Sequence, residues 1–326
     1  MIASRLDHSR QLHVLSGTLS IMPQNPAIRA GVPIGNAHMK KAAQSPMLVA
    51  TLGIMLFSMM DAVMKGQALA MGTYNAMFWR MAMGALIVAV LYLPTRPVPA
   101  SGRVLKIHLI RAALTAVMAY LFFFGLTRIP LAQAIGLSFI APIITLFLAV
   151  PLLGERIGAN AKLAAVLGFG GVMVVVGGEL LAVDEGSDAV GMAAVLLSAV
   201  MYAFNLILQR MQALVAKPLE IAFYQNTIVF VMLLVGVPFA VSWPASQLQW
   251  GGAMLAAAFA VGSLMLMSLA YRQAEAQRLV VIEYTAFIWA AMLGWWFFAE
   301  PVTARTLLGT GLIVLGCLVS ARGGGR

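Results

Sequence analysis

Residues 131–151, LAQAIGLSFIAPIITLFLAVP, and residues 161–178, AKLAAVLGFGGVMVVVGG, are two long apolar runs joined by the short link LLGERIGAN. Each run has about the length that an α-helix needs to cross a bilayer, ~20 residues for ~30 Å of hydrocarbon. Because the link is short, the second helix must return through the membrane antiparallel to the first. This stretch therefore predicts a helical membrane protein.

The composition of the whole chain agrees with that prediction. Of its 326 residues, 62% are hydrophobic and 10% are charged, and the mean hydropathy is +0.93. A soluble domain carries ~25% charged residues, and one globule of this size cannot bury so much apolar surface. The composition excludes a soluble enzyme, a disordered hub and a secreted disulfide-rich domain. Cys317 is the single cysteine, so no intrachain disulfide can form.

Apolar runs of spanning length recur along the chain. They cover about residues 47–68, 74–93, 107–126, 131–151, 161–178, 190–209, 219–241, 251–271, 279–298 and 303–321. We expect an all-α integral membrane protein of ten transmembrane helices, with one five-helix unit at 47–178 and a second at 190–321. Residues 1–46 lack both a sustained apolar period and the apolar core of a signal peptide, so we expect a disordered cytoplasmic tail.

The distribution of basic residues predicts an orientation. The chain has 21 Lys and Arg against 11 Asp and Glu, a net charge of +10. With the amino terminus inside, 17 of the 21, Arg111 among them, fall on the cytoplasmic side, and Lys65, Arg80, Arg128 and Arg305 fall on the other. Lys and Arg are retained on the cytoplasmic side of membranes. We therefore expect a multi-pass protein of a bacterial inner membrane, with both termini cytoplasmic and no nucleic-acid partner.

An internal repeat relates the two halves at an offset of 144–145 residues. Asp61 aligns with Asn205, and Phe78-Trp79-Arg80 aligns with Phe223-Tyr224-Gln225. Because each half has an odd number of predicted spans, the second half enters the membrane in the opposite orientation. Such inverted repeats are typical of secondary transporters with a central site and alternating access. The alternative is a duplicated bundle that serves as a non-transporting membrane scaffold.

One short motif stands out in this arrangement. The fourth span ends in Leu153-Gly154-Glu155-Arg156 before a Gly-rich fifth span, and the segment from Arg128 to Ala134 leads into it. In these features the chain resembles the EamA branch of the drug/metabolite transporter superfamily. The second half departs from the motif, with Phe298-Ala299-Glu300-Pro301 in its place. The resemblance implies a transporter, and because relatives move amino acids, riboflavin or S-adenosylmethionine, it leaves the cargo open.

Ionisable side chains within the first two spans are candidates for a site. Such a group costs at least ~2.5–3.5 kcal/mol in a span unless it is paired or hydrated. Asp61 and Lys65 stand at i and i+4 on one helical face. They form either a structural ion pair at the outer rim or a gate or substrate-carboxylate site. Arg80, near the outer end of its span, either reaches the lipid headgroups or binds an anionic group of the substrate.

Glu283 lies about one turn inside the ninth span. One interpretation is that it reaches back to Arg278 at the membrane edge. The other is that it exchanges the coupling proton or cation, or holds a substrate amine or sulfonium. Trp79, Tyr202 and Tyr224 are aromatic candidates for a cavity because they recur at repeat-related positions and have polar tips, whereas most aromatic residues of a membrane protein face lipid. A cavity with aromatic walls suits a planar amphipathic solute.

Motifs of other protein classes are missing. The sequence has no phosphate-binding loop, and His8, His13, His38 and His108 do not form a metal-ligand set. We expect no cofactor and no enzymatic activity. A membrane-embedded enzyme or a channel is the alternative, but neither a catalytic cluster at headgroup level nor a ring of like charges is visible. The sequence therefore predicts a secondary transporter of a small organic metabolite (an amino acid, vitamin or nucleoside-like solute). It is expected to be driven by protons or by exchange, and to act in the lipid bilayer as a monomer or weak homodimer.

Overall fold

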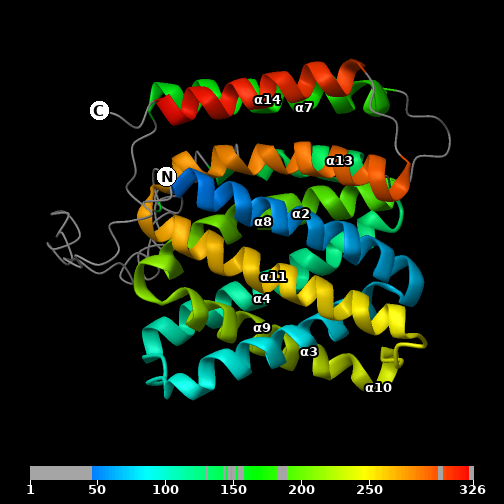
Figure 1. Ribbon diagram of the computed structural model, residues 1–326, viewed down its shortest axis with the longest axis vertical. Helices are drawn as coiled ribbons and strands as arrows, with labels where there is room; N and C mark the ends of the chain where they lie inside the picture. The colour runs from blue at the N-terminus through cyan, green and yellow to red at the C-terminus, as the bar shows by residue number, and fades with distance from the viewer. Residues whose placement is uncertain are drawn as a thin grey trace, which may run out of the picture. The chain divides into compact units, whose positions relative to one another are not determined.

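The computed structural model describes residues 46–129, 131–141, 144–145, 148, 152, 158–181, 189–299 and 304–322. Within these ranges every regular element is a helix (Figure 1). The predicted tail, apart from Pro46, and the motif from Leu153 to Arg156 lie outside the described residues.

Helices cover most of the residues of the predicted apolar runs that the structure describes. The α-helices are α2 (Pro46–Met71), α3 (Thr73–Tyr92), α4 (Gly102–Leu126), α5 (Leu131–Ser138), α7 (Ala159–Leu181), α8 (Ala189–Val215), α9 (Pro218–Leu233), α10 (Val237–Ala240), α11 (Gln247–Gln273), α12 (Ala276–Leu279), α13 (Ala286–Phe298) and α14 (Ala304–Arg322). Short 3-10 segments are η2 (Leu93–Thr95), η3 (Leu234–Gly236) and η4 (Val280–Thr285).

Seven helical segments of the described chain are long and apolar enough to cross a membrane. They are Pro46–Met71, Thr73–Thr95, Gly102–Leu126, Ala189–Val215, Pro218–Ala240, Gln247–Gln273 and Val281–Phe298. Helices α7 and α14 contain shorter apolar stretches, Lys162–Gly171 and Leu307–Gly316. Helix α5 covers only the first part of the predicted span 131–151. The protein is thus a multi-pass helical membrane protein, and the count of ten spans stays a prediction.

Residue types at the helix ends explain where several helices begin or stop. Gly72 separates α2 from α3 with φ of +83°, a conformation that is costly for residues with a Cβ atom. Pro218 opens α9 directly after Lys217, where its missing N–H loses no helical hydrogen bond. At the start of α11, the Ser246 hydroxyl accepts a hydrogen bond from the backbone N–H of Gln249 at 3.2 Å.

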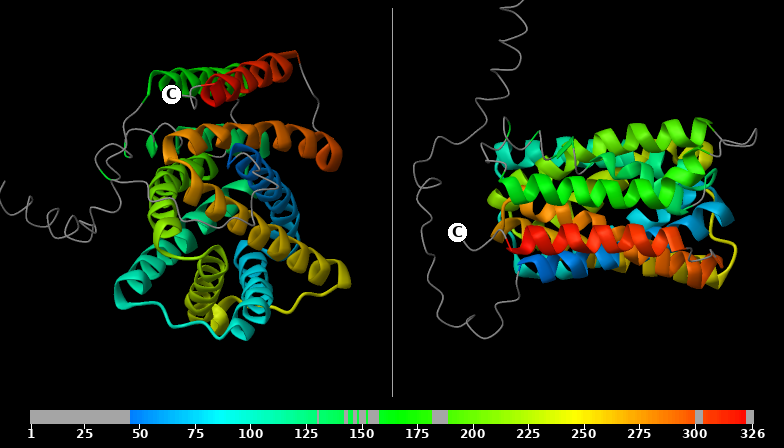
Figure 2. Two further views of the ribbon diagram at one scale, coloured as in Figure 1. Left: turned by 60° about the vertical axis from the view of Figure 1, so that its left-hand side comes forward. Right: turned by 90° about the horizontal axis from the view of Figure 1, so that it is seen from above.

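The packing of the helices follows the internal repeat. An offset of 144–145 residues carries α2 onto α8, α3 onto α9, α4 onto α11 and α7 onto α14. Helix α2 packs along α11, and its counterpart α8 packs along α4. Helix α3 packs against its own counterpart α9, and α7 against α14, which run side by side in all views (Figures 1 and 2). The contacts between the two halves are therefore symmetric, because each contact maps onto its equivalent or onto itself when the halves are exchanged.

Small residues allow two of these pairs to approach closely. A Cβ atom added to Gly125 of α4 would stand 3.0 Å from the backbone oxygen of Gly191 on α8. One added to Gly316 of α14 would stand 2.9 Å from the backbone oxygen of Ala164 on α7. Close approach through small residues is typical of helix packing in membranes. Gly125 thus lets α4 approach α8, and Gly316 lets α14 approach α7.

Candidate functional site

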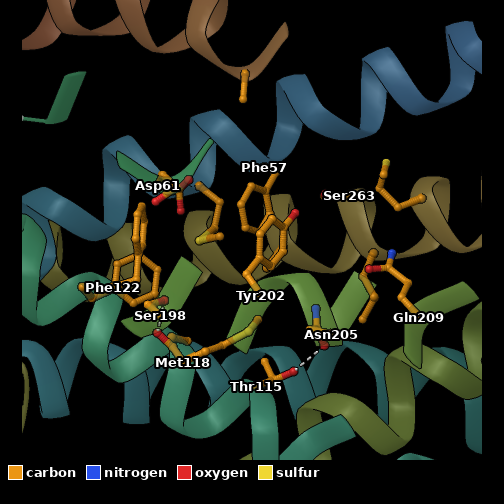
Figure 3. Close-up of a pocket in the computed structure, with 18 of the residues that line it drawn as sticks. Phe57, Asp61, Thr115, Met118, Phe122, Ser198, Tyr202, Asn205, Gln209 and Ser263 are labelled. Atoms are coloured by element: carbon orange, nitrogen blue, oxygen red, sulfur yellow. Dashed lines mark hydrogen bonds between the residues drawn. The ribbon is translucent and has the colours of Figure 1, made fainter. Parts of the chain in front are cut away.

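A cavity of about 190 Å³ lies among α2, α3, α4, α5, α8, α9, α11, η4 and α13 (Figure 3). Most of its wall consists of Phe, Met, Ala and other apolar side chains. Its polar lining comes from Asp61, Arg80, Arg111, Thr115, Ser138, Ser198, Tyr202, Asn205, Gln209, Gln225, Asn226, Ser263 and Glu283. Such a concentration of polar groups is expensive between membrane-spanning helices, so this cavity is the candidate functional site.

Both repeats line the cavity at equivalent positions. Residues of the lining that stand 144 or 145 positions apart include Asp61 and Asn205, Arg80 and Gln225, Met118 and Ser263, and Ser138 and Glu283. Figure 3 shows Asp61 and Phe57 on α2 facing Tyr202 and Asn205 of α8. The cavity therefore lies at the interface of the two repeats, and each repeat supplies different chemistry at the matched places.

Arg111 is held by three amide side chains of α8. Its Nε donates to Asn205 Oδ1 at 3.1 Å, Nη1 to Gln212 Oε1 at 2.7 Å, and Nη2 to Gln209 Oε1 at 3.2 Å. Only 3% of Arg111 is exposed. We call these four residues the Arg111 cage. The amide oxygens orient the guanidinium but carry no negative charge, so its positive charge is available to an anionic group in the cavity.

Asp61 and Arg80 form the second charged group of the cavity. Both are buried, and each acts electrostatically on the other, but no ion pair within 4.0 Å joins them among the described residues. Arg80 also lies over the ring of Phe123, with 5.9 Å from Cζ to the ring centroid. Asp61 Oδ1 and Arg80 Nε make no hydrogen bond within the described chain. Buried polar atoms of this kind are rare in proteins and call for a partner.

Glu283 is the third charged element, and it sits on η4. Its Oε2 accepts a hydrogen bond from the Tyr202 hydroxyl at 2.8 Å, whereas Oε1 makes none in the part of the chain that the structure describes. The carboxylate is buried, with 5% of the residue exposed. Its hydrogen-bond partner is Tyr202 of α8, and Arg278 does not enter its surroundings. The structure therefore brings together two of the candidates from the sequence, Tyr202 and Glu283.

The remaining three candidates lie elsewhere. The Lys65 ammonium donates to the backbone oxygen of Ile129 at 3.5 Å and stands 5.4 Å from the centroid of the Phe298 ring. Arg80, and not Lys65, is the basic residue that acts on Asp61. Trp79 donates through Nε1 to the backbone oxygen of Ser242 at 2.9 Å.

Tyr224 accepts a hydrogen bond from the backbone N–H of Ala100 at 3.2 Å and stacks on His108. Lys65, Trp79 and Tyr224 are not part of the cavity wall. Four of the seven candidates, Asp61, Arg80, Tyr202 and Glu283, therefore share one site.

Arg111 is the main residue that the sequence did not reveal as a site residue. It was counted with the basic residues of the cytoplasmic side, but the structure buries it in the cavity wall nine residues after α4 begins at Gly102. A signal was present in its partners: Asn205, Gln209 and Gln212 stand at i, i+4 and i+7, so one face of an otherwise apolar helix carries three amides. Such a stripe within a span indicates an internal polar contact.

Fold and site together define a class: a multi-pass membrane protein that encloses a charged cavity between two repeats. The model of the EamA-like transporter family matches residues 44–177 and again residues 189–322. The chain therefore belongs to the EamA-like transporter family of the drug/metabolite transporter superfamily. The two matches establish the repeat, one in each half, that the self-alignment predicted.

Named relatives are transporters. The chain is 27% identical over 287 residues to the pseudopaline exporter CntI of Pseudomonas aeruginosa, covering 86% of this chain and 96% of the exporter. It is 27% identical over 222 residues to a riboflavin transporter of Rhizobium johnstonii, covering 66% of this chain and 70% of that protein. A solved crystal structure shares the fold with a TM-score of 0.71 at 18% identity, covering 87% of this chain and 100% of that one.

Proposed function

We propose that this protein is a secondary transporter that moves a small organic metabolite across a bacterial inner membrane, with the cavity as the solute site. The observation that carries the proposal is the set of buried polar atoms on the cavity wall that lack a partner within the described chain. They belong to Asp61, Arg80, Gln225 and Glu283. Membrane proteins keep such groups where a solute or ion binds.

The chemistry of the wall suits a solute with groups of both charges. Arg111 and Arg80 offer guanidinium donors to a carboxylate or a similar anion, because arginine binds planar anions well. Asp61 and Glu283 offer acceptors to an amine or another cation. Phe57, the remaining rings and the methionines pack against an apolar part. An amino-acid-like or vitamin-like solute combines these features.

The mechanism we propose is alternating access between two inverted repeats. The matched packing of α2 on α11 and of α8 on α4 supports it, because equivalent contacts can open and close on opposite sides of one central site. Glu283 is the proposed coupling residue: its carboxylate faces the cavity and has a single described hydrogen-bond partner, Tyr202. Glu283 either binds and releases the coupling proton during the transport cycle, or it holds the cationic group of the solute during exchange.

The orientation we propose places both termini in the cytoplasm. Arg111 and Arg80 both line the cavity, and without them 16 basic residues remain on the cytoplasmic side against three on the other, so the asymmetry persists. The acidic segment that includes Asp184 and Glu185 then faces the periplasm. A monomer or weak homodimer is the proposed assembly.

Transport by the purified protein tests the proposal. The protein is reconstituted into liposomes, which are loaded in turn with amino acids, riboflavin, S-adenosylmethionine and pseudopaline, and counterflow of the labelled solute is measured. We expect saturable counterflow of one solute, which Arg111→Met strongly reduces and Lys106→Met leaves unchanged, because Lys106 is exposed on α4. Counterflow that survives Arg111→Met, Asp61→Asn and Glu283→Gln alike would contradict the cavity as the solute site.

A further inference from the structure

A second polar cluster lies beside the Arg111 cage, outside the cavity wall, where α4, α8 and α9 meet. His108 is fully buried, and its Nδ1 lies 2.5 Å from Gln212 Nε2. Its Nε2 lies 3.5 Å from Glu220 Oε1, and its ring stacks on Tyr224 with 4.5 Å between centroids. Gln212 is fully buried as well and links His108 to Arg111.

The directions of these hydrogen bonds follow from Arg111. A guanidinium only donates, so the Gln212 atom that lies 2.7 Å from Nη1 must be the carbonyl oxygen Oε1. The NH₂ group of Gln212 therefore points at His108, and Nδ1 must accept. In the neutral imidazole the proton then stands on Nε2, which faces the Glu220 carboxylate.

A second proton on His108 is incompatible with this arrangement. The imidazolium carries N–H groups at both ring nitrogens, so the Nδ1–H and the NH₂ of Gln212 would be two donors facing each other. Rotating the Gln212 amide satisfies His108 but turns its NH₂ toward Arg111, which also only donates. Gln212 can serve the protonated His108 or Arg111, and not both.

We propose that His108 is a proton-binding site coupled to the solute site: when His108 takes a proton, Gln212 turns to it and releases Arg111 Nη1 to an anionic group in the cavity. The inference rests on the proposed function of the cavity. A proton can enter from Glu220, whose side chain is 18% exposed near the start of α9. Proton and solute anion then bind together, and the coupling is reciprocal.

Groups that can carry charge surround His108 on three helices. The Glu220 carboxylate of α9 lies 3.5 Å from Nε2, and Arg111 of α4 lies on the other side of Gln212. Tyr224 of α9 covers the ring, and Tyr92 of α3 acts electrostatically with Glu220. Histidine is the side chain whose charge most readily changes near neutral pH. Here the Gln212 amide connects His108 to Arg111, a residue of the cavity wall.

Nitrogen NMR of the protein in nanodiscs, with labelled His and Arg side chains, tests the coupling between His108 and Arg111 without any solute. His108→Gln assigns the His108 signals, because the other three histidines lie within residues 1–45. We expect the Nε2–H tautomer in the neutral state, and an Arg111 signal that shifts with the same midpoint as His108 on acidification. In His108→Gln the Arg111 signal should not shift. An Nδ1–H tautomer, or an Arg111 signal that ignores His108, overturns the proposal.

Gln212→Glu supplies a second, sharper variant. A carboxylate at this position accepts from Arg111 and from His108 at once, so the conflict disappears. We expect His108 to carry N–H groups at both ring nitrogens up to a higher pH than in the wild type, with Nε2–H still facing Glu220, and the Arg111 signal to lose its dependence on His108. For the solute identified by counterflow, wild-type affinity should tighten ~5-fold or more on acidification, the lower end of typical coupling, and Gln212→Glu should abolish this. NMR results as expected without any counterflow would contradict the proposed function alone. Wild-type pH dependence retained by both His108→Gln and Gln212→Glu would overturn the coupling.

Discussion

Replacing Arg111 by Met removes hydrogen bonds of 3.1, 2.7 and 3.2 Å in one step. Asn205 Oδ1 keeps a donor, the Thr115 hydroxyl at 3.2 Å, but the amide oxygens of Gln209 and Gln212 lose theirs. A buried acceptor without a partner costs about 1–3 kcal/mol, so the two together should lower the free energy of unfolding by about 2–6 kcal/mol. Access of cavity water to Gln209 favours the lower part of that range.

A double-mutant cycle separates this effect from the loss of packing. Gln209→Leu alone removes one charge-assisted hydrogen bond, worth about 1.5–3 kcal/mol. In the double variant no amide oxygen is stranded at position 209, so its loss should be smaller than the sum of the single losses by about 1–3 kcal/mol.

Unfolding in mixed micelles, followed by circular dichroism as the fraction of denaturing detergent rises, measures these free energies. Lys106→Met is the matched control, since it removes an exposed basic residue of the same helix and should stay within about 0.5 kcal/mol of wild type. Two results would refute the cage: an Arg111→Met variant as stable as the control, or single losses that add to within about 0.5 kcal/mol.

Three further outcomes are expected. Glu283→Gln keeps an acceptor for its tyrosine partner and removes only the ionisation, so the variant should fold normally. In the liposome assay it should lose pH-dependent transport while exchange survives. An unchanged transport rate and pH profile would contradict a coupling role. Gly125→Ala places a Cβ atom 3.0 Å from the backbone of α8 and should lower the free energy of unfolding by about 1–3 kcal/mol in the micelle assay. Gly66→Ala, whose Cβ atom would have nothing within 4 Å, should not. Equal unfolding midpoints for the two variants would count against the close packing of α4 on α8. A reporter fused after Arg322 should read cytoplasmic and a tag at 183–187 should be reached from the periplasm; both sites on one side exclude inverted repeats.

The helices were predictable because spans depend on local composition. The run at 190–209 became α8, Ala189–Val215, and the run at 251–271 became α11, Gln247–Gln273. The helices extend beyond the runs because hydropathy detects only the apolar part, while backbone hydrogen bonding continues into the polar ends. The offset of 144–145 residues also relates the helix contacts, because equivalent sequences form equivalent packing surfaces.

The candidate site was only partly predictable. Asp61, Arg80, Tyr202 and Glu283 could be found because an ionisable or polar group inside a span is conspicuous by itself. Lys65 shares a helix face with Asp61, but its long side chain reaches Ile129 instead, and sequence spacing does not set that choice.

Arg111 shows the limit of reasoning from sequence alone. A basic residue a few turns from a helix end looks like one that holds the loop in the cytoplasm. Its partner Asn205 is 94 residues away and Gln212 is 101 residues away. Only the packing of α4 on α8 brings them together.

Access to the cavity from the two sides of the membrane tests the central claim most directly. Ser263, a buried residue of the cavity wall, is replaced by Cys in a Cys317→Ser background, and a membrane-impermeant thiol reagent is applied to right-side-out and to inside-out vesicles. Leu255→Cys, exposed on the outside of the same helix, is the lipid-facing control and should resist the reagent. Alternating access predicts labelling of Ser263→Cys from both sides, reduced in each case by the transported solute. Labelling from one side only, or labelling that the solute does not affect, would contradict the account.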